Sequence, residues 1–101
     1  MVTKKATKAK VGKQLVLVRT FGAGVHCGTL DYQRGPEVKL LNARRIWSWS
    51  NGPNTCSELA RFGHSGTARI ATDVPWIILP DCMEIIPMTD EAWASLTPRW
   101  L

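Results

Sequence analysis

The chain has 101 residues, of which 45% are hydrophobic, and it carries a formal net charge of +5. This length suits one small domain with a modest core. No apolar run reaches the roughly 18 residues that a membrane-spanning helix needs, and no hydrophobic stretch follows the charged N-terminus as a secretory signal requires, so we expect a soluble cytoplasmic protein.

The positive charge is concentrated at the N-terminus. From residue 14 onward, eight basic and eight acidic side chains balance each other. We therefore expect residues 1–13 to form a disordered lysine-rich tail and residues 14–101 to form a single small β-rich domain. The alternative role for the tail is weak contact with nucleic acid phosphates. The tail contains no acidic residue and five basic ones: Lys4, Lys5, Lys8, Lys10 and Lys13.

Three extended segments are predicted in the first half of the chain. Residues 14–20 contain an apolar run of strand length, and residues 25–32 form a second strand candidate after a glycine-rich turn. Residues 33–36 have the composition of a hairpin turn, which leads into a long strand at residues 37–49.

Two short helices are predicted in the second half of the chain. Thr55 or Ser57 can cap a helix over residues 57–62, and a glycine follows it. Asp90 can cap a C-terminal helix over residues 91–96, which a Thr-Pro pair ends. This second helix either docks on the domain or contributes its tryptophan to an interface.

Further strands are predicted at residues 68–72, 75–80 and 81–87. Strands joined by turns, without an alternating strand and helix rhythm, predict a mainly β fold. We expect a small, strongly bent antiparallel sheet or half-open barrel with one short inserted helix and a short C-terminal helix. Leu40 and Leu41 are consecutive apolar residues of the long strand, so its inward face should switch there, as at a β-bulge.

The strand pattern resembles that of Sm-like and SH3-like small barrels. Gly28-Thr29-Leu30 falls where such barrels place the glycine of a bent second strand. Val38 and Leu40, followed by Ala43, resemble the third strand, and the segment from Glu84 to Pro87 resembles the last one. The resemblance implies that residues 52–67 are an insertion.

Several blocks of the sequence also resemble a small domain of unknown function that is common in tailed phages and prophages. The resemblance spans residues 18–87, and the chain departs from the pattern after Gly63 and at both termini. It implies a phage-encoded accessory protein in the cytoplasm of the bacterial host, and it supplies no catalytic residues. The blocks are Val18-Arg19-Thr20, Ala23-Gly24-Val25, Gly28-Thr29-Leu30, Asn42-Ala43-Arg44-Arg45-Ile46-Trp47 with Trp49, Ser57-Glu58-Leu59-Ala60 with Gly63, and Glu84-Ile85-Ile86-Pro87.

The candidate binding surface lies at the end of the long strand. Successive strand residues point to opposite faces, so Arg45, Trp47 and Trp49 are expected to share one face, with Arg44 on the other. A flat indole platform beside a guanidinium suits a planar, anionic or nucleotide-like ligand. The alternative is that both tryptophans pack against the first helix while Arg45 covers an edge.

Other residues are candidates for the same site. Arg19 adjoins the glycine-rich turn, whose backbone amides can cradle an anion, although a plain turn is the alternative. Arg44, if buried, needs a carboxylate partner, and Asp31, Glu37 or Glu84 can serve. We assign the ligand-binding role to Arg45, Trp47, Trp49, Arg19, Arg44 and His26.

Metal binding and catalysis are not expected. The odd number of cysteines, without a C-x-x-C pair, indicates a reducing compartment. No paired acid and base and no nucleophile motif is present, so we expect no cofactor and no enzymatic activity. The possible metal ligands lack the close spacing of zinc sites, and the one adjacent pair, His26-Cys27, points to opposite faces of a strand. They are His26, Cys27, Cys56, His64 and Cys82.

These features favour a non-enzymatic phage accessory protein that is homo-oligomeric and acts in counter-defence. It would bind and sequester a nucleotide-derived small molecule or a host defence protein. The alternative is a nucleic-acid-binding Sm-like module that uses the lysine-rich arm. The neutral charge of the domain counts against this alternative, because nucleic-acid binders usually carry a basic stripe on the fold itself.

Overall fold

The computed structural model describes residues 14–49, 55–64 and 67–100, so the tail expected at residues 1–13 lies outside it. The described residues form strands at or close to every predicted position. The elements are β2 (Leu15–Thr20), β3 (Val25–Arg34), β4 (Glu37–Trp49), α2 (Cys56–Phe62), β5 (Ala68–Ile70), β6 (Val74–Leu79), β7 (Cys82–Pro87), α3 (Asp90–Ser95) and β8 (Arg99–Trp100).

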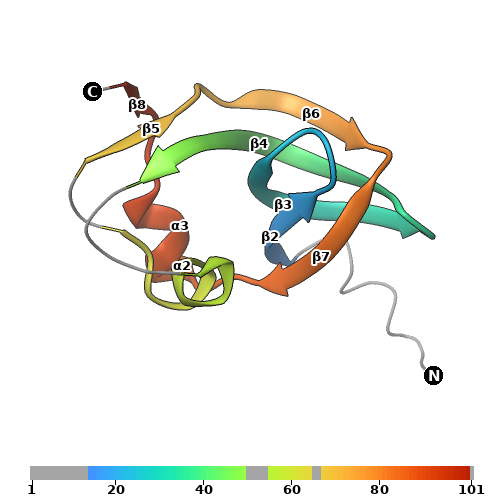
Figure 1. The fold of residues 1–101 in the computed structure, drawn as a ribbon, viewed down its shortest axis with the longest axis horizontal. Helices are drawn as coiled ribbons and strands as arrows, with labels where there is room; N and C mark the ends of the chain where they lie inside the picture. Colours follow the sequence, from blue (N-terminus) through green and yellow to red (C-terminus); the bar gives the residue numbers. More distant parts are fainter. Residues whose placement is uncertain (1–13, 50–54, 65–66, 101) are drawn as a thin grey trace.

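The strands form one antiparallel sheet that bends without closing. Its order is β7-β2-β3-β4-β5-β8, and β6 pairs with β4 beside this path. The long β4 pairs with β6 along residues 38–43 and with β5 along residues 46–49. Figure 1 shows β6 running beside β4 and turning into β7, which returns to β2. The predicted mainly β, half-open arrangement with two short helices is therefore confirmed.

Apolar side chains are buried on both faces of the sheet. The strand β2 contributes to both layers, which explains why residues 15–18 are continuously apolar. One layer, the helix-side core, includes Leu17, Cys27, Ile46, Leu59, Ala60, Ala68, Ile70, Met88, Ala92 and Leu96. The other layer, the barrel-side core, includes Val16, Val18, Leu30, Val38, Leu40, Ala43 and Leu79.

The two helices cover the helix-side core and have regular caps. The Thr55 hydroxyl accepts a hydrogen bond from the Glu58 amide at 3.2 Å, and α2 ends at Gly63, where φ is +77°. Helix α3 is capped by Thr89, one residue before the predicted Asp90, because the Thr89 hydroxyl accepts from the Ala92 amide at 3.0 Å.

Helix α3 docks on the domain, as one of the two sequence interpretations expected. Ala92 and Leu96 are fully buried, and Trp93 packs against the same core. None of the helices in the described part of the chain is long and apolar enough to span a membrane.

A β-bulge bends β4 close to the position that the sequence predicts. Between the pairs Cys27 with Arg44 and Thr29 with Leu41, β4 contains one residue more than β3. The extra residue follows Leu41 and is Asn42, which has a φ of +51°. The bulge lets the barrel-side core continue from Leu40 to Ala43.

Gly28 is required at this bend. A Cβ atom on Gly28 would lie 2.8 Å from the Leu41 carbonyl oxygen and 3.2 Å from the Ala43 Cα, and both are backbone atoms. The glycine therefore allows the two strands to approach where β4 bulges, in agreement with the bent second strand that the sequence predicts.

Candidate functional site

Pairing between β3 and β4 decides which candidate residues share a face. His26 lies opposite Arg45, and Cys27 lies opposite Arg44. Directly paired residues in an antiparallel sheet project to the same face, and Cys27 belongs to the helix-side core. Arg44 therefore points to the helix side, whereas Arg45 and His26 point to the opposite face, as the strand alternation predicts for the two arginines.

A second β-bulge separates the two tryptophans. Ile46 pairs with Ile70 and Ser48 pairs with Arg69, so Trp47 is an extra residue on β4. After the bulge, Trp49 packs against the helix-side core, together with Ile46. The expectation that Trp47 and Trp49 share one face is therefore wrong, because one inserted residue reverses the alternation between them.

Arg45 and Trp47 each line two adjoining hollows in the protein surface. The first, which we call the His26 hollow, measures about 340 Å³. The second, the loop hollow, measures about 460 Å³ and is bounded by Arg45, Ile46, Trp47 and the turn at residues 22–24. None of the described residues that line either hollow is acidic. The walls of the His26 hollow are His26, Ala43, Arg45, Trp47, Ala71, Thr72, Val74 and Ile77.

His26 forms the buried wall of the first hollow. Only 1% of the residue is exposed, and its Nε2 lies 2.9 Å from the carbonyl oxygen of Ala23. Its Nδ1 is buried and has no hydrogen-bond partner among the described residues. Burial lowers the pKa of the imidazole, and nearby Arg45 lowers it further, while the hydrogen bond to Ala23 and the charge of Asp81 act in the opposite direction.

The exposed part of the site consists of a cation and an indole. The Arg45 guanidinium carbon lies 5.4 Å from the centre of the Trp47 ring, and 56% of Trp47 is exposed. No described carboxylate forms an ion pair with Arg45, in contrast to Arg19, Lys39 and Arg44. The two hollows therefore share the guanidinium of Arg45, which forms no ion pair with a described carboxylate.

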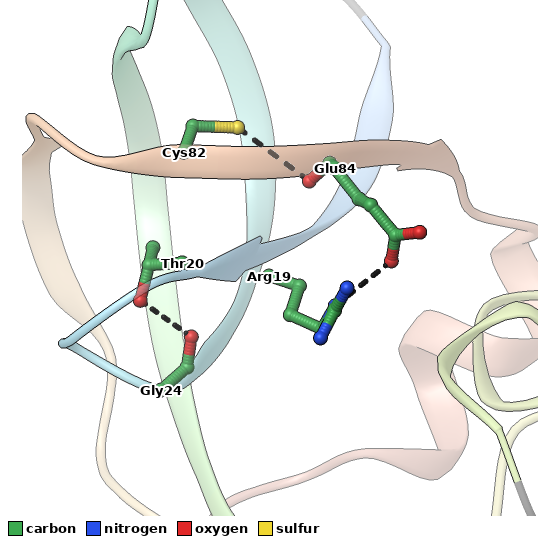
Figure 2. A network of polar contacts seen from close by, with 5 residues as sticks. All are labelled: Arg19, Thr20, Gly24, Cys82 and Glu84. Atoms are coloured by element: carbon green, nitrogen blue, oxygen red, sulfur yellow. Dashed lines mark hydrogen bonds and ion pairs between the residues drawn. The ribbon is translucent and has the colours of Figure 1, made fainter.

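Arg19 does not join this site. It pairs with Val25, which pairs with Ile46 of the helix-side core, so it lies on the other face of the sheet. Figure 2 shows its side chain directed at Glu84 of β7, with Arg19 Nε 3.0 Å from the carboxylate. The pair is exposed, and it links β2 to β7 on the helix side of the sheet.

The glycine-rich turn does not supply an anion cradle. The Gly22 amide donates to the Asp81 carboxylate at 2.8 Å, and the Ala23 amide donates to the Thr20 hydroxyl at 2.8 Å. The same hydroxyl donates to the Gly24 carbonyl at 2.8 Å, as Figure 2 shows. Two of the amides are thus already used inside the protein, so the sequence alternative of a plain turn is the correct one.

Arg44 has a structural environment. Its Nη1 donates to the carbonyl oxygens of Trp93 and Leu96 at 3.2 and 3.0 Å, and its Nε lies 2.8 Å from an Asp73 carboxylate oxygen. The guanidinium carbon also lies 3.6 Å from the centre of the Trp93 ring. Its carboxylate partner is Asp73, and not Asp31, Glu37 or Glu84 as the sequence suggests, because Asp73 precedes Val74, which pairs with Ala43 of β4.

None of the three described cysteines lines either hollow. No group of three described His, Cys, Asp or Glu side chains is placed to hold a metal ion. All three cysteines are free thiols, and burial raises the pKa of Cys27 to about 12. Such a thiol is not a nucleophile at neutral pH.

Sequence reasoning missed one wall of the His26 hollow. Ala71 and Thr72 follow β5, and Val74 and Ile77 belong to β6. The sequence predicted extended segments near these positions, but nothing in their composition indicates that β6 lies beside β4. Of the six residues assigned to ligand binding, the structure brings together Arg45, Trp47 and His26; the other three lie on the opposite face.

Comparison with known proteins gives a family and no function. No curated protein and no solved structure matches the chain significantly. A model of the family described as a domain of unknown function, DUF6948, matches residues 13–96. This match includes both helices, both hollows and every strand of the sheet except β8. The chain therefore belongs to the DUF6948 family.

Proposed function

We propose that this protein is a non-enzymatic binding protein that captures a small planar anionic ligand, such as a nucleotide derivative, at Arg45 and Trp47. The observation that carries the proposal is the convergence of an exposed indole, a guanidinium without a described carboxylate partner and a buried imidazole on adjoining hollows. The volume of the His26 hollow lies in the range of small-molecule sites.

The residues divide the work of binding in a simple way. A planar group can stack on Trp47, which contributes about 1–3 kcal/mol per base in single-stranded nucleic acid complexes. Arg45 supplies positive charge and a fork of N–H donors for an anionic group. The apolar residues of the walls, Ala43 and Ile77 among them, would exclude water from the planar group of the bound ligand.

The biological setting of this proposal comes from the sequence. A phage-encoded protein that sequesters a nucleotide-derived signal in the bacterial cytoplasm would serve counter-defence, and the phage-like sequence blocks support this role. Binding of a host defence protein at the same surface is the macromolecular version of the proposal. The homo-oligomeric state stays a prediction, which light scattering of the purified protein can check.

Isothermal titration with nucleoside monophosphates, cyclic dinucleotides and ADP-ribose tests the proposal. For the ligand that binds, Trp47→Ala should raise the Kd about 5- to 150-fold, as loss of one stacking contact implies. Arg45→Met should raise it about 10-fold or more, because a charged hydrogen bond is lost.

Matched control variants are available on other surfaces of the protein. Trp76 is as exposed as Trp47, at 56%, and Arg19 is an exposed arginine on the opposite face. Trp76→Ala and Arg19→Met should leave the Kd unchanged. Absence of heat with every ligand, or equal losses in the controls, would refute the small-ligand proposal.

The nucleic-acid alternative depends on residues 1–13, which lie outside the described residues. It predicts steeply salt-dependent binding of RNA or single-stranded DNA that weakens when these residues are deleted. Salt-insensitive binding of a mononucleotide, unaffected by the deletion, would favour capture at the hollows instead.

A further inference from the structure

His26 has an unused acceptor in a place where unused acceptors are costly. The residue is 1% exposed, and its Nδ1 has no partner among the described residues. Buried polar groups nearly always have a hydrogen-bond partner, and an exception calls for a specific explanation. Because His26 lines the His26 hollow, a molecule that enters this hollow and displaces the atoms covering Nδ1 can supply the missing partner.

The other ring nitrogen fixes the role of Nδ1. Nε2 lies 2.9 Å from the carbonyl oxygen of Ala23, which can only accept, so Nε2 carries the hydrogen. In the neutral ring, Nδ1 then presents a lone pair. Burial and the neighbouring charge of Arg45 favour the neutral ring by lowering its pKa, against the opposing effects of the Ala23 hydrogen bond and Asp81.

The register of the sheet places this acceptor beside a donor. His26 and Arg45 are directly opposed on β3 and β4 and project to the same face, where the Cβ atoms of such pairs lie about 5 Å apart. Trp47 lines the same hollow. The wall therefore combines the guanidinium of Arg45 with a buried acceptor behind it, next to a surface for stacking.

We infer that the His26 hollow recognises the hydrogen-bonding edge of a nucleobase, with an N–H of the base donated to His26 Nδ1 and the neighbouring acceptor bound by Arg45. The inference rests on the proposed function and adds to it the part of the ligand that enters the hollow. Each of the four common bases has such a neighbouring donor and acceptor. Arg45 lines both hollows and has five N–H donors, so the same guanidinium can also contact a phosphate on the side of the loop hollow.

The test compares nucleotides with analogues in which methyl groups replace the donor hydrogens. UMP, GMP, AMP and CMP are titrated into the protein, followed by N3-methyl-UMP, N1,N2,N2-trimethyl-GMP, N6,N6-dimethyl-AMP or N4,N4-dimethyl-CMP for whichever parent binds. Ribose 5-phosphate serves as the control without a base. We expect methylation to weaken binding at least about tenfold, since a hydrogen bond is lost and the buried acceptor stays unpaired, and ribose 5-phosphate to bind no better than the methylated analogue.

Variants at His26 provide the second measurement. His26→Phe keeps a flat ring without an acceptor, and it should bind the parent and the methylated nucleotide equally. His26→Asn, which keeps a side-chain acceptor, should recover part of the preference. Circular dichroism confirms that each variant is folded, and the methylated ligands test the inference on the unaltered protein should a variant fail to fold.

The outcomes separate this inference from the proposed function. Binding that depends on Trp47 and Arg45 but tolerates methylation of the base would overturn edge recognition and leave ligand capture standing. Absence of binding by all four nucleotides would overturn edge recognition of a nucleobase, while binding of another planar anion at Arg45 and Trp47 would still support the broader proposal.

Discussion

Arg44 and Arg45 are adjacent in the chain, and we predict that replacing them has opposite consequences. Arg44→Met should destabilise the fold without affecting ligand binding, because its guanidinium holds the C-terminal end of α3 against the sheet. Arg45→Met should raise the Kd about tenfold or more with little effect on stability, because its guanidinium lines the two hollows.

The contacts of Arg44 set the size of the expected effect. Hydrogen bonds from a charged group to the Trp93 and Leu96 carbonyls contribute about 1.5–3 kcal/mol each, and the cation–π contact with Trp93 contributes about 1 kcal/mol. The ion pair adds at most about 1 kcal/mol, since the Asp73 side chain is 43% exposed. These contacts share one guanidinium and are not additive, so we expect a loss of about 3 kcal/mol.

Urea denaturation followed by circular dichroism measures this loss as a shift of the midpoint. In thermal unfolding, about 3 kcal/mol corresponds to a drop of roughly 12–24 °C in Tm for a domain of this size. Arg45→Met, the matched variant, should change the free energy of unfolding by no more than about 0.5 kcal/mol. A loss below about 1 kcal/mol for Arg44→Met, or equal losses for both variants, would refute the assignment of Arg44 to the fold and Arg45 to the site.

Three further changes have defined outcomes. Gly28→Ala should lower the free energy of unfolding by about 1–3 kcal/mol in the same urea assay, because its Cβ would meet backbone atoms, whereas Gly22→Ala, whose Cβ would meet only the tip of a side chain, should change it little. The cysteines should differ in their rate of alkylation by iodoacetamide, followed over time by peptide mass spectrometry. Cys27 should react last, because it is fully buried and its pKa is about 12, and the two half-buried cysteines should react first. Early modification of Cys27 in the folded protein would contradict its burial. The lowered pKa of His26 means that the unfolded chain binds more protons just below pH 6.5, so the free energy of unfolding should fall as the pH drops through this range, and His26→Phe should flatten the dependence.

Much of the fold can be predicted from local patterns in the sequence. Continuous apolar residues in β2, the glycine at Gly28 and the capping residue Thr55 each have one structural meaning, and each is found in the predicted role. The separation of Arg44 from Arg45 is equally secure, because alternation along a strand holds over two consecutive residues whatever the partner strand does.

The candidate site was predictable only in part, because it depends on contacts between distant segments. That β6 would lie beside β4, and so bring Ile77 to the hollow, follows from the sheet order and not from any pattern within β6. The carboxylate partner of Arg44 is Asp73 for the same reason. The use of the Gly22 amide by Asp81 also joins residues far apart in the chain.

The separation of the two tryptophans shows how one inserted residue in β4 affects both the helix-side core and the candidate site. Regular alternation would place Ser48 beside Ile46 in the helix-side core and Trp49 with Trp47 at the hollows. The extra residue at Trp47 places Trp49 on the core instead and leaves Ser48 exposed. A polar serine at the position where alternation calls for a core residue is the one sequence signal of this bulge, since burying its hydroxyl without a partner would be unfavourable. The bulge thus fills the helix-side core with one indole and keeps the other at the hollows, beside Arg45.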